Sequence, residues 1–271
     1  MNTFFLDRLN SEPHALAFAG QSTPWPVALA DQSANPALDE ALHTHAAAAQ
    51  ALLYPVSAEL LATTGRPVDL FGFEPNPARL GAAAAASASV PGIALTQLGA
   101  LLDAAALGYN PTQAKPVAVL GHSQGVLAVH MVQAICEAGS IDAAAAKIDE
   151  ILAIATLIGV AGTRQARQLG LAARHGEATP MLSVKDITRA QVDALIERVD
   201  GARGPIAVAV TNSATHYVLS GYPEDLAAFG VEVAKEHKRQ AQLREEKVRG
   251  GRVFDPVLEY LDVTLPFHSP L

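Results

Sequence analysis

A five-residue stretch, Gly121-His122-Ser123-Gln124-Gly125, constrains the fold of this chain more than any other feature. The apolar run 117–120 precedes it and the apolar run 126–129 follows it, which predicts a strand, a sharp turn and a helix. At such a turn the serine adopts a strained backbone conformation, and the two glycines let the strand and the helix pass close together. The pattern therefore predicts a nucleophile elbow, with the Ser123 hydroxyl at the carboxyl end of a sheet.

The same motif predicts part of an oxyanion hole. The backbone N–H of Gln124 would point at the serine from the first turn of the helix, where negative charge is favoured. The pattern G-x-S-x-G also occurs by chance in glycine-rich loops. The apolar strand before it and the helix after it favour the catalytic interpretation.

Composition limits the partners that we expect. Half of the 271 residues are hydrophobic and only 17% are charged, so part of the surface is expected to be covered in the native setting. The net charge of −8 argues against nucleic acid as a partner. The single cysteine, Cys136, excludes an intrachain disulfide and suits a reducing compartment. No targeting segment is evident, and the longest apolar stretch noted, 151–162, is too short to span a membrane, so we expect a cytoplasmic protein.

The first part of the chain alternates between strand and helix patterns. The predicted elements are a strand over 14–20, a loop over 21–26, a helix from Asn35-Pro36 to Gly65, a helix beginning at Pro91, a loop over 108–116 and a long helix over 141–169.

The pattern changes after residue 175. The predicted elements there are a strand over 181–184, a helix capped by Asp186 that ends at Val199, a strand over 206–210, a turn over 211–215, a strand over 216–220, a helix over 223–243 and a strand over 260–265. This β-α-β-β-α-β order is that of a ferredoxin-like subdomain. We therefore predict an α/β fold in three parts: a parallel-sheet core over 1–175, an insert over 176–265, and a return to the core over 266–271.

A serine nucleophile needs a nearby base, and histidine is the commonest. Among nine histidines, His268 stands out because it follows the predicted strand 260–265, in a loop at a strand end. An ordinary loop histidine is the alternative interpretation. His122 is expected to pack beside the elbow, His130 to lie out of reach and His216 to begin a strand. Five others are expected to be solvated: His14, His43, His45, His175 and His237.

Seven segments spread over most of the chain point to one family: Ala17–Gln21 with Trp25, Ser89–Gly92, Leu95–Gln97, Gly121–Val129, Leu157–Gly159, Lys247–Gly251 and Phe267–Pro270. Together they resemble the acyltransferase family typified by malonyl-CoA:acyl-carrier-protein transacylase. The resemblance is strongest to the N-terminal acetyltransferase region of fungal and actinobacterial type I fatty acid synthases. It implies a hydrolase-like parallel-sheet core with a ferredoxin-like (βαββαβ) insert.

The resemblance also implies roles. Ser123 would be acylated by a CoA thioester with His268 as general base, and the backbone N–H groups of Gln21 and Gln124 would hold the oxyanion. The acyl group would pass to the phosphopantetheine thiol of an acyl carrier protein. No metal and no cofactor of its own is implied for this region.

Acyl selectivity is expected to depend on Ile158 and Gly159. Malonyl-loading relatives carry an arginine before this glycine, which forms a bidentate pair with the malonyl carboxylate. A carboxylate buried against Ile158 would cost several kcal/mol, so the substitution predicts that acetyl is admitted and malonyl rejected. The alternative is that Ile158 is a core position and that Arg164 or Arg167 is the corresponding arginine.

Two features depart from the family pattern. Its Gly-Gln-Gly loop is Gly20-Gln21-Ser22 here, so that Ser22 adds a Cβ to the loop whose geometry positions the oxyanion donor. The family continues beyond the position of Leu271, so we expect a fragment or the first piece of a longer multienzyme, with the core incomplete. A basic run could bind CoA phosphates or the carrier protein, or form a solvated helix face: Lys235, Lys238, Arg239, Arg244, Lys247, Arg249 and Arg252.

The expected protein is an acetyl-CoA:carrier-protein transferase that primes fatty acid synthesis. Acetyl-CoA, the carrier protein and the other domains of a large, homo-oligomeric synthase are its expected partners, with neither nucleic acid nor membrane. Three other functions stay open: a malonyl- or palmitoyl-loading transacylase, a serine thioesterase or hydrolase, and a structural module with a vestigial site.

Overall fold

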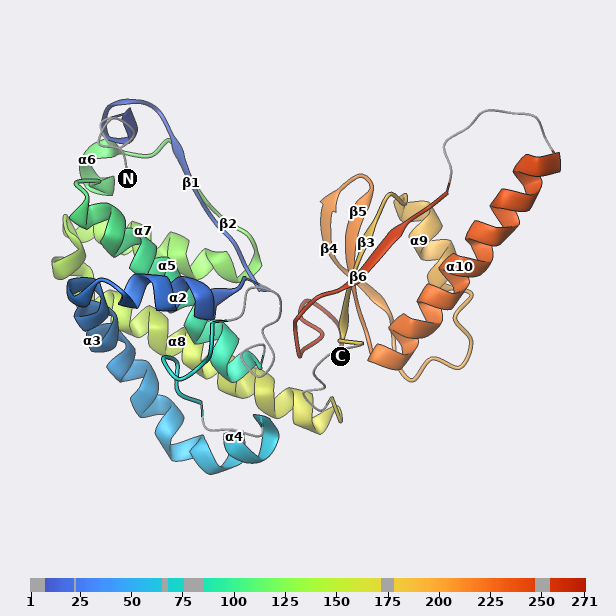
Figure 1. Ribbon diagram of the computed structural model, residues 1–271, viewed down its shortest axis with the longest axis horizontal. Coiled ribbons are helices and arrows are strands. Elements are labelled where there is room, and N and C mark those ends of the chain that lie inside the picture. The colour runs from blue at the N-terminus through green and yellow to red at the C-terminus, as the bar shows by residue number, and fades with distance from the viewer. Residues whose placement is uncertain (1–7, 22, 65–67, 76–84, 172–177, 247–253) are drawn as a thin grey trace. The chain divides into compact units, whose positions relative to one another are not determined.

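The computed structural model describes residues 8–21, 23–64, 68–75, 85–171, 178–246 and 254–271. The chain divides into two compact units, Met1–Gln165 and Ala166–Leu271 (Figure 1). The division falls before the predicted domain boundary at 175, and residues 266–271 group with the second unit. The predicted return of that segment to the core therefore stays a prediction.

A parallel pair of strands places the elbow in the first unit. Strand β1 (Ala15–Phe18) pairs with β2 (Ala118–Gly121), and Phe18 lies opposite Gly121 (Figure 1). The pairing continues past the strands, since the His122 N–H donates to the Phe18 carbonyl at 2.9 Å. Because parallel strands end at the same edge of a sheet, the chain that leaves β1 toward Gln21 starts beside the elbow.

Helix α5 (Ala86–Ala106) lies at the centre of the first unit, and most of its residues are buried. Two of its glycines leave room for side chains of α2 (Trp25–Ser33) to pack directly against the α5 backbone. A Cβ on Gly92 would lie 2.6 Å from the Trp25 ring, and a Cβ on Gly99 would lie 2.3 Å from Gln32. Trp25 is fully buried as a result, and it also meets the Phe73 ring edge to face at 5.3 Å.

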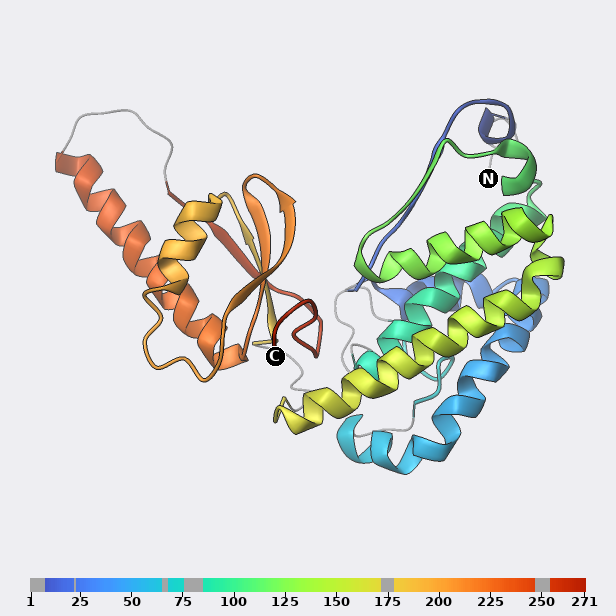
Figure 2. The same ribbon diagram turned by 180° about the vertical axis from the view of Figure 1, so that it is seen from behind.

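Among the described residues, α5 is also the one helix long and apolar enough to cross a membrane. In this structure, 72% of its apolar window is buried, which is typical of the core helix of a folded domain. The apolar stretch singled out in the sequence, 151–162, belongs instead to α8 (Ile141–Gln168). That helix has the predicted extent almost to the residue, and it runs along the helical layer with α3 (Pro36–Leu53), as Figure 2 shows.

Four predictions for the first unit are wrong. Helix α2 begins at Trp25, where a loop was predicted, because Pro26 occupies an N-terminal helical position that suits proline. The helix that Asn35 caps ends at Leu53 and continues as η1 (Tyr54–Val56), which contains Pro55, and α4 (Ser57–Thr64). Pro91 lies inside α5 instead of beginning it. The first strand is also shorter than the predicted 14–20.

The second unit has the predicted ferredoxin-like order. Its elements are β3 (Met181–Lys185), α9 (Arg189–Ile196), β4 (Ala207–Ser213), β5 (His216–Ser220), α10 (Pro223–Glu246) and β6 (Val257–Tyr260). The strands form one antiparallel sheet in the order β4-β5-β3-β6. Leu182, Val184 and Leu219 point to the helices and pack with Phe229 of α10. Met181 and Val218 point to the other face, where they pack with Val263.

Four details of the second unit differ from the predictions. Thr188 caps α9 through a capping box with Gln191, whereas Asp186 takes a left-handed conformation with φ of 61°. Helix α9 ends at Ile196, before the predicted Val199, and β4 extends to Ser213 through residues predicted as a turn. The last strand lies at 257–260 instead of 260–265, because its register is set by pairing with β3.

A buried carboxylate joins the two helices of the second unit. Glu236 of α10 is 7% exposed and accepts hydrogen bonds from Arg239, Gln240 and Arg198, which follows α9. The hydrogen bond from Arg239, with those from Gln240 and Arg198, lowers the pKa of Glu236 to about 2, although burial acts in the opposite direction.

This network predicts that Glu236→Gln destabilises the protein at neutral pH. The folded-state pKa of Glu236 lies below its ordinary value, so its contribution is present above about pH 4.5 and is lost as the pH falls toward 2. Because both arginines are about half exposed, we expect a loss of about 1–2 kcal/mol at pH 7, measured by urea unfolding. Glu232→Gln, which removes only a pair with the exposed Lys235, is the control and should change little. A Glu236→Gln loss that persists unchanged at pH 2.5 would contradict the assignment.

Candidate active site

Ser123 lies at a strained corner between β2 and a helix. Its φ is 52°, a left-handed value that is uncommon for a residue with a Cβ. The 3₁₀ turn η3 (Ser123–Gly125) follows at once and leads into α7 (Val126–Ala138). This strand, sharp turn and helix confirm the elbow geometry that the motif predicts.

The glycines around Ser123 are required by close backbone contacts. A Cβ on Gly125 would lie 2.3 Å from the Phe18 carbonyl oxygen of β1, and a Cβ on Gly121 would lie 2.4 Å from the Val126 nitrogen. A Cβ on Gly20 would lie 2.7 Å from the His122 carbonyl oxygen. Real Cβ atoms do not approach so closely, so the elbow and the end of β1 can pack this way only with glycine at all three positions.

The two predicted oxyanion glutamines meet through their side chains. The Gln21 amide nitrogen donates to the Gln124 side-chain oxygen. Gln124 in turn donates to the Val90 carbonyl at 2.5 Å, and the Ser89 hydroxyl donates to the Gln21 side-chain oxygen at 3.1 Å. Gln21 and Gln124 therefore lie together beside the elbow, and their predicted role as oxyanion donors stays a prediction. Ser22, the departure from the family loop, lies outside the described residues.

Sequence reasoning did not assign the supporting role of α5. Ser89 and Val90 were noted only as part of a resemblance, yet they contact both glutamines. The signal that could have found them is the pair Ser89-Val90 directly before Pro91-Gly92, where the chain packs closely on Trp25.

Gly159, the residue after Ile158, packs on the same end of α5. A Cβ on Gly159 would lie 2.5 Å from the Ala86 carbonyl oxygen, and the Thr163 hydroxyl one turn later accepts the Ser87 N–H at 2.9 Å. Ile158 itself is 44% exposed. Ile154, one turn earlier on α8, and the neighbouring Leu157 are exposed apolar residues as well. The position predicted to set acyl selectivity is thus joined to the elbow through the first turns of α5.

Arg164, the alternative to Ile158, already has a partner. Its guanidinium forms a bidentate pair with the Glu59 carboxylate of α4, at 2.9 and 3.1 Å. This pair raises the pKa of Arg164, chiefly through the hydrogen bonds that it donates to Glu59. The structure gives Arg167 no corresponding ion pair within the part of the chain it describes.

His268, the predicted base, belongs to the second unit. Its φ of 57° is left-handed, and the preceding Phe267 packs against Met181, Val218 and Val263. The loop is therefore fixed to the open face of the sheet by its aromatic residue. Because Ser123 belongs to the first unit, the Ser123–His268 pair stays a prediction.

Four of the five histidines expected to be solvated have defined partners, and one of these four, His43, is exposed as well. His45 is 9% exposed, and its Nδ1 lies 2.7 Å from the Asp149 carboxylate. His14 contacts the Tyr109 hydroxyl at 2.8 Å, and His43 stacks on Phe71. His237 binds the Phe254 carbonyl at 2.7 Å. His122 is exposed, which argues against the predicted packing beside the elbow, and His175 lies outside the described residues.

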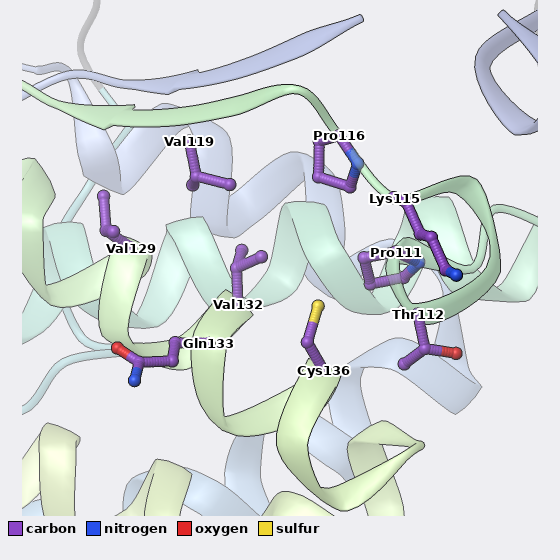
Figure 3. A pocket seen from close by; sticks show the side chains of 9 residues that line it. All are labelled: Pro111, Thr112, Lys115, Pro116, Val119, Val129, Val132, Gln133 and Cys136. Atoms are coloured by element: carbon purple, nitrogen blue, oxygen red, sulfur yellow. The ribbon is translucent and has the colours of Figure 1, made fainter. Parts of the chain in front are cut away.

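The described part of the basic run is largely neutralised. Arg239 pairs with Glu236 and Lys235 with Glu232, as expected for a solvated helix face. Lys247, Arg249 and Arg252 lie outside the described residues. A cavity of about 440 Å³, lined by residues that include Pro111, Val132 and Cys136, contains none of the predicted site residues (Figure 3). The Cys136 sulfur points into it, but burial raises the pKa of this thiol, which disfavours the reactive thiolate.

Comparison with solved structures confirms the fold class. The malonyl CoA-acyl carrier protein transacylase of Coxiella burnetii is 18% identical, with a TM-score of 0.53 over 96% of this chain and 64% of that one. The corresponding protein of Streptococcus pneumoniae is 14% identical, with a TM-score of 0.50 over 93% of this chain and 64% of that one. The chain thus has the fold of these acyltransferases, a parallel-sheet unit with a ferredoxin-like unit, and spans less than two thirds of their length.

Sequence comparison relates the chain to fatty acid synthases. Residues 180–260 match the family described as fatty acid synthase central AT domain. The fatty acid synthase beta subunit hexB of Dothistroma septosporum is 27% identical over 164 residues, which are 56% of this chain and 8% of that protein. These matches confirm the predicted resemblance to an acyltransferase domain of a fatty acid synthase.

The elbow contacts predict that Gly125→Ala destabilises the protein severely. The new methyl would overlap the Phe18 carbonyl oxygen, so β1 and η3 must move apart. We expect a loss of about 2–4 kcal/mol, measured by thermal unfolding. Gly230→Ala is the control. Gly230 lies in α10, and a methyl there would meet only Leu258 of β6, at 3.6 Å, so this variant should be as stable as the wild type or slightly more so. Equal melting temperatures for the two variants would refute the close approach.

Proposed function

We propose that this chain is an acyltransferase that moves an acetyl group from acetyl-CoA to an acyl carrier protein through an acyl-Ser123 intermediate. The observation that carries the proposal is Ser123 at a left-handed strand-to-helix corner, with Gln21 and Gln124 joined beside it. The resemblance to fatty acid synthase acyltransferase domains supports the same reaction class.

The first half of the reaction forms the acyl-enzyme. The Ser123 oxygen attacks the thioester carbonyl carbon while His268 takes the hydroxyl proton. The carbonyl oxygen becomes an oxyanion, which the backbone N–H groups of Gln21 and Gln124 stabilise, each donor contributing about 3 kcal/mol. The C–S bond then breaks, and His268 returns its proton to the departing CoA thiolate.

The second half transfers the acyl group. The phosphopantetheine thiol of the carrier protein gives its proton to His268 and attacks the acyl-serine carbonyl, and the Ser123 oxygen leaves as a hydroxyl. Both halves use the same base, His268, and the same oxyanion donors, and neither half calls for a metal or prosthetic group of the chain's own. The carrier protein and the other domains of a large cytoplasmic synthase are the proposed partners, and a homo-oligomer is the proposed assembly.

Ile158 is proposed to exclude malonyl groups. It belongs to the segment that packs on α5, and α5 contacts both oxyanion glutamines. A carboxylate there would have no counter-charge from Ile158, and Arg164 is already paired with Glu59. An acetyl group carries no such charge.

The nucleophile is tested by intact-protein mass spectrometry after brief incubation with acetyl-CoA or malonyl-CoA. We expect an acetyl adduct on the wild type, none on Ser123→Ala, and little malonyl adduct on either. Ser183→Ala is the control, because Ser183 also lies beside a histidine, 3.0 Å from His216, and should keep the adduct.

The other functions give different results in that experiment. Release of CoA without an adduct would indicate a thioesterase or hydrolase. An adduct that survives Ser123→Ala would place the nucleophile elsewhere. Neither adduct nor CoA release would indicate a module with a vestigial site.

Selectivity is tested with Ile158→Arg. Because this side chain is 44% exposed, arginine can be accommodated without burying its charge, and it would supply the missing counter-charge. We expect the ratio of malonyl to acetyl adduct to rise by at least about tenfold, the effect of roughly 1.4 kcal/mol. Leu157→Arg adds the same charge at the neighbouring, 56% exposed position and should leave the ratio unchanged. Equal ratios for the two variants would refute the role of Ile158.

A further inference from the structure

We propose that Ser89 is a positioning residue, which holds the two proposed oxyanion glutamines in place through a chain of hydrogen bonds that begins and ends on α5. The proposal rests on the function proposed above and extends it to a residue with no chemical role. We call the set Ser89, Gln21, Gln124 and Val90 the glutamine clamp.

The clamp begins and ends on neighbouring residues of α5. The Ser89 hydroxyl donates to the Gln21 side-chain oxygen at 3.1 Å, and the Gln21 amide nitrogen donates to the Gln124 side-chain oxygen. The Gln124 amide nitrogen donates to the Val90 carbonyl at 2.5 Å. Each glutamine thus uses its oxygen as an acceptor and its nitrogen as a donor, which fixes the orientation of both amides.

The anchor of the clamp is rigid. Ser89 is 1% exposed, and it lies in the buried first turns of the central helix. The next residues of α5 are held by the Trp25 ring against Gly92 and by the Gln32 hydrogen bond to the Thr96 carbonyl at 2.9 Å. A side chain held by such a helix can fix the loop that it binds.

The clamp acts on the side chains, whereas the proposed oxyanion donors are the backbone N–H groups of the same residues. Gln21 follows Gly20, whose carbonyl accepts the Thr23 hydroxyl at 2.6 Å and whose α-carbon faces the elbow. Fixing both side chains to one helix therefore fixes the spacing of the two donors. An oxyanion hole needs donors at about 2.7–3.1 Å from the oxyanion, so a small shift in this spacing weakens it.

Removal of the Ser89 hydroxyl should slow acylation of Ser123 without weakening binding of the CoA thioester. For Ser89→Ala we expect the maximal rate of acyl-enzyme formation to fall about 10-fold to 100-fold, with the half-saturating thioester concentration unchanged within about twofold. The rates come from rapid-quench mass spectrometry of the 271-residue chain with acetyl-CoA.

Ser87→Ala is a matched control. Ser87 lies two residues earlier on α5 and is equally buried, but its hydroxyl has no hydrogen-bond partner among the described residues. The two variants remove the same atom from the same turn of one helix. Ser87→Ala should therefore acylate at the wild-type rate, and equal rates for Ser87→Ala and Ser89→Ala would overturn the proposal.

A double-mutant cycle separates positioning from a general loss of stability. Gln21→Ala removes the side chain that Ser89 binds but keeps the backbone N–H. If the clamp acts as proposed, adding Ser89→Ala to Gln21→Ala changes neither the acylation rate nor the melting temperature further. Additive effects would overturn it. Absence of any adduct on the wild type would refute the proposed function itself, whereas normal wild-type acylation with additive variants would refute only the clamp.

Discussion

The close approach of three backbone segments at the elbow is the constraint on which the first unit depends. Glycines 20, 121 and 125 allow the end of β1, the end of β2 and the turn η3 to lie where any Cβ would overlap a carbonyl or amide atom. The cost of the strained serine is concentrated at this point, since Ser123 is the one residue of the turn with positive φ. The parallel pairing of β1 with β2 and the packing of the helices hold that conformation in place.

Helix α5 connects this corner to the rest of the unit. Its first turns contact Gln21, Gln124 and the Gly159 region, and its later turns carry the glycines that accept Trp25 and Gln32. The proposed nucleophile, oxyanion donors and acyl-selectivity position therefore share one buried support. Such an arrangement keeps reactive groups in fixed positions while loops outside it vary.

Local patterns in the sequence predicted the parts of the fold that depend on local chemistry. The elbow and the β-α-β-β-α-β order follow from glycine spacing and from the hydrophobic period, and both are confirmed. The sequence also contains the capping box of Thr188 and Gln191, which begins α9 in place of the predicted Asp186 cap. The extent of β6 and the His45–Asp149 contact could not be predicted from the sequence, because each depends on partners distant in the chain. For the same reason the sequence did not predict the glutamine clamp, because Ser89 and Gln21 are distant in the chain and meet only in the folded structure.

The strained corner is tested most directly by comparing the stabilities of Ser123→Gly and Ser123→Ala. At φ of 52° an alanine keeps the steric cost of its Cβ, whereas glycine has none. The elbow geometry predicts that Ser123→Gly is more stable than Ser123→Ala by about 1 kcal/mol in urea unfolding. A Ser123→Ala variant as stable as Ser123→Gly or more so, as at an ordinary backbone position, would contradict the nucleophile elbow on which the proposed function rests.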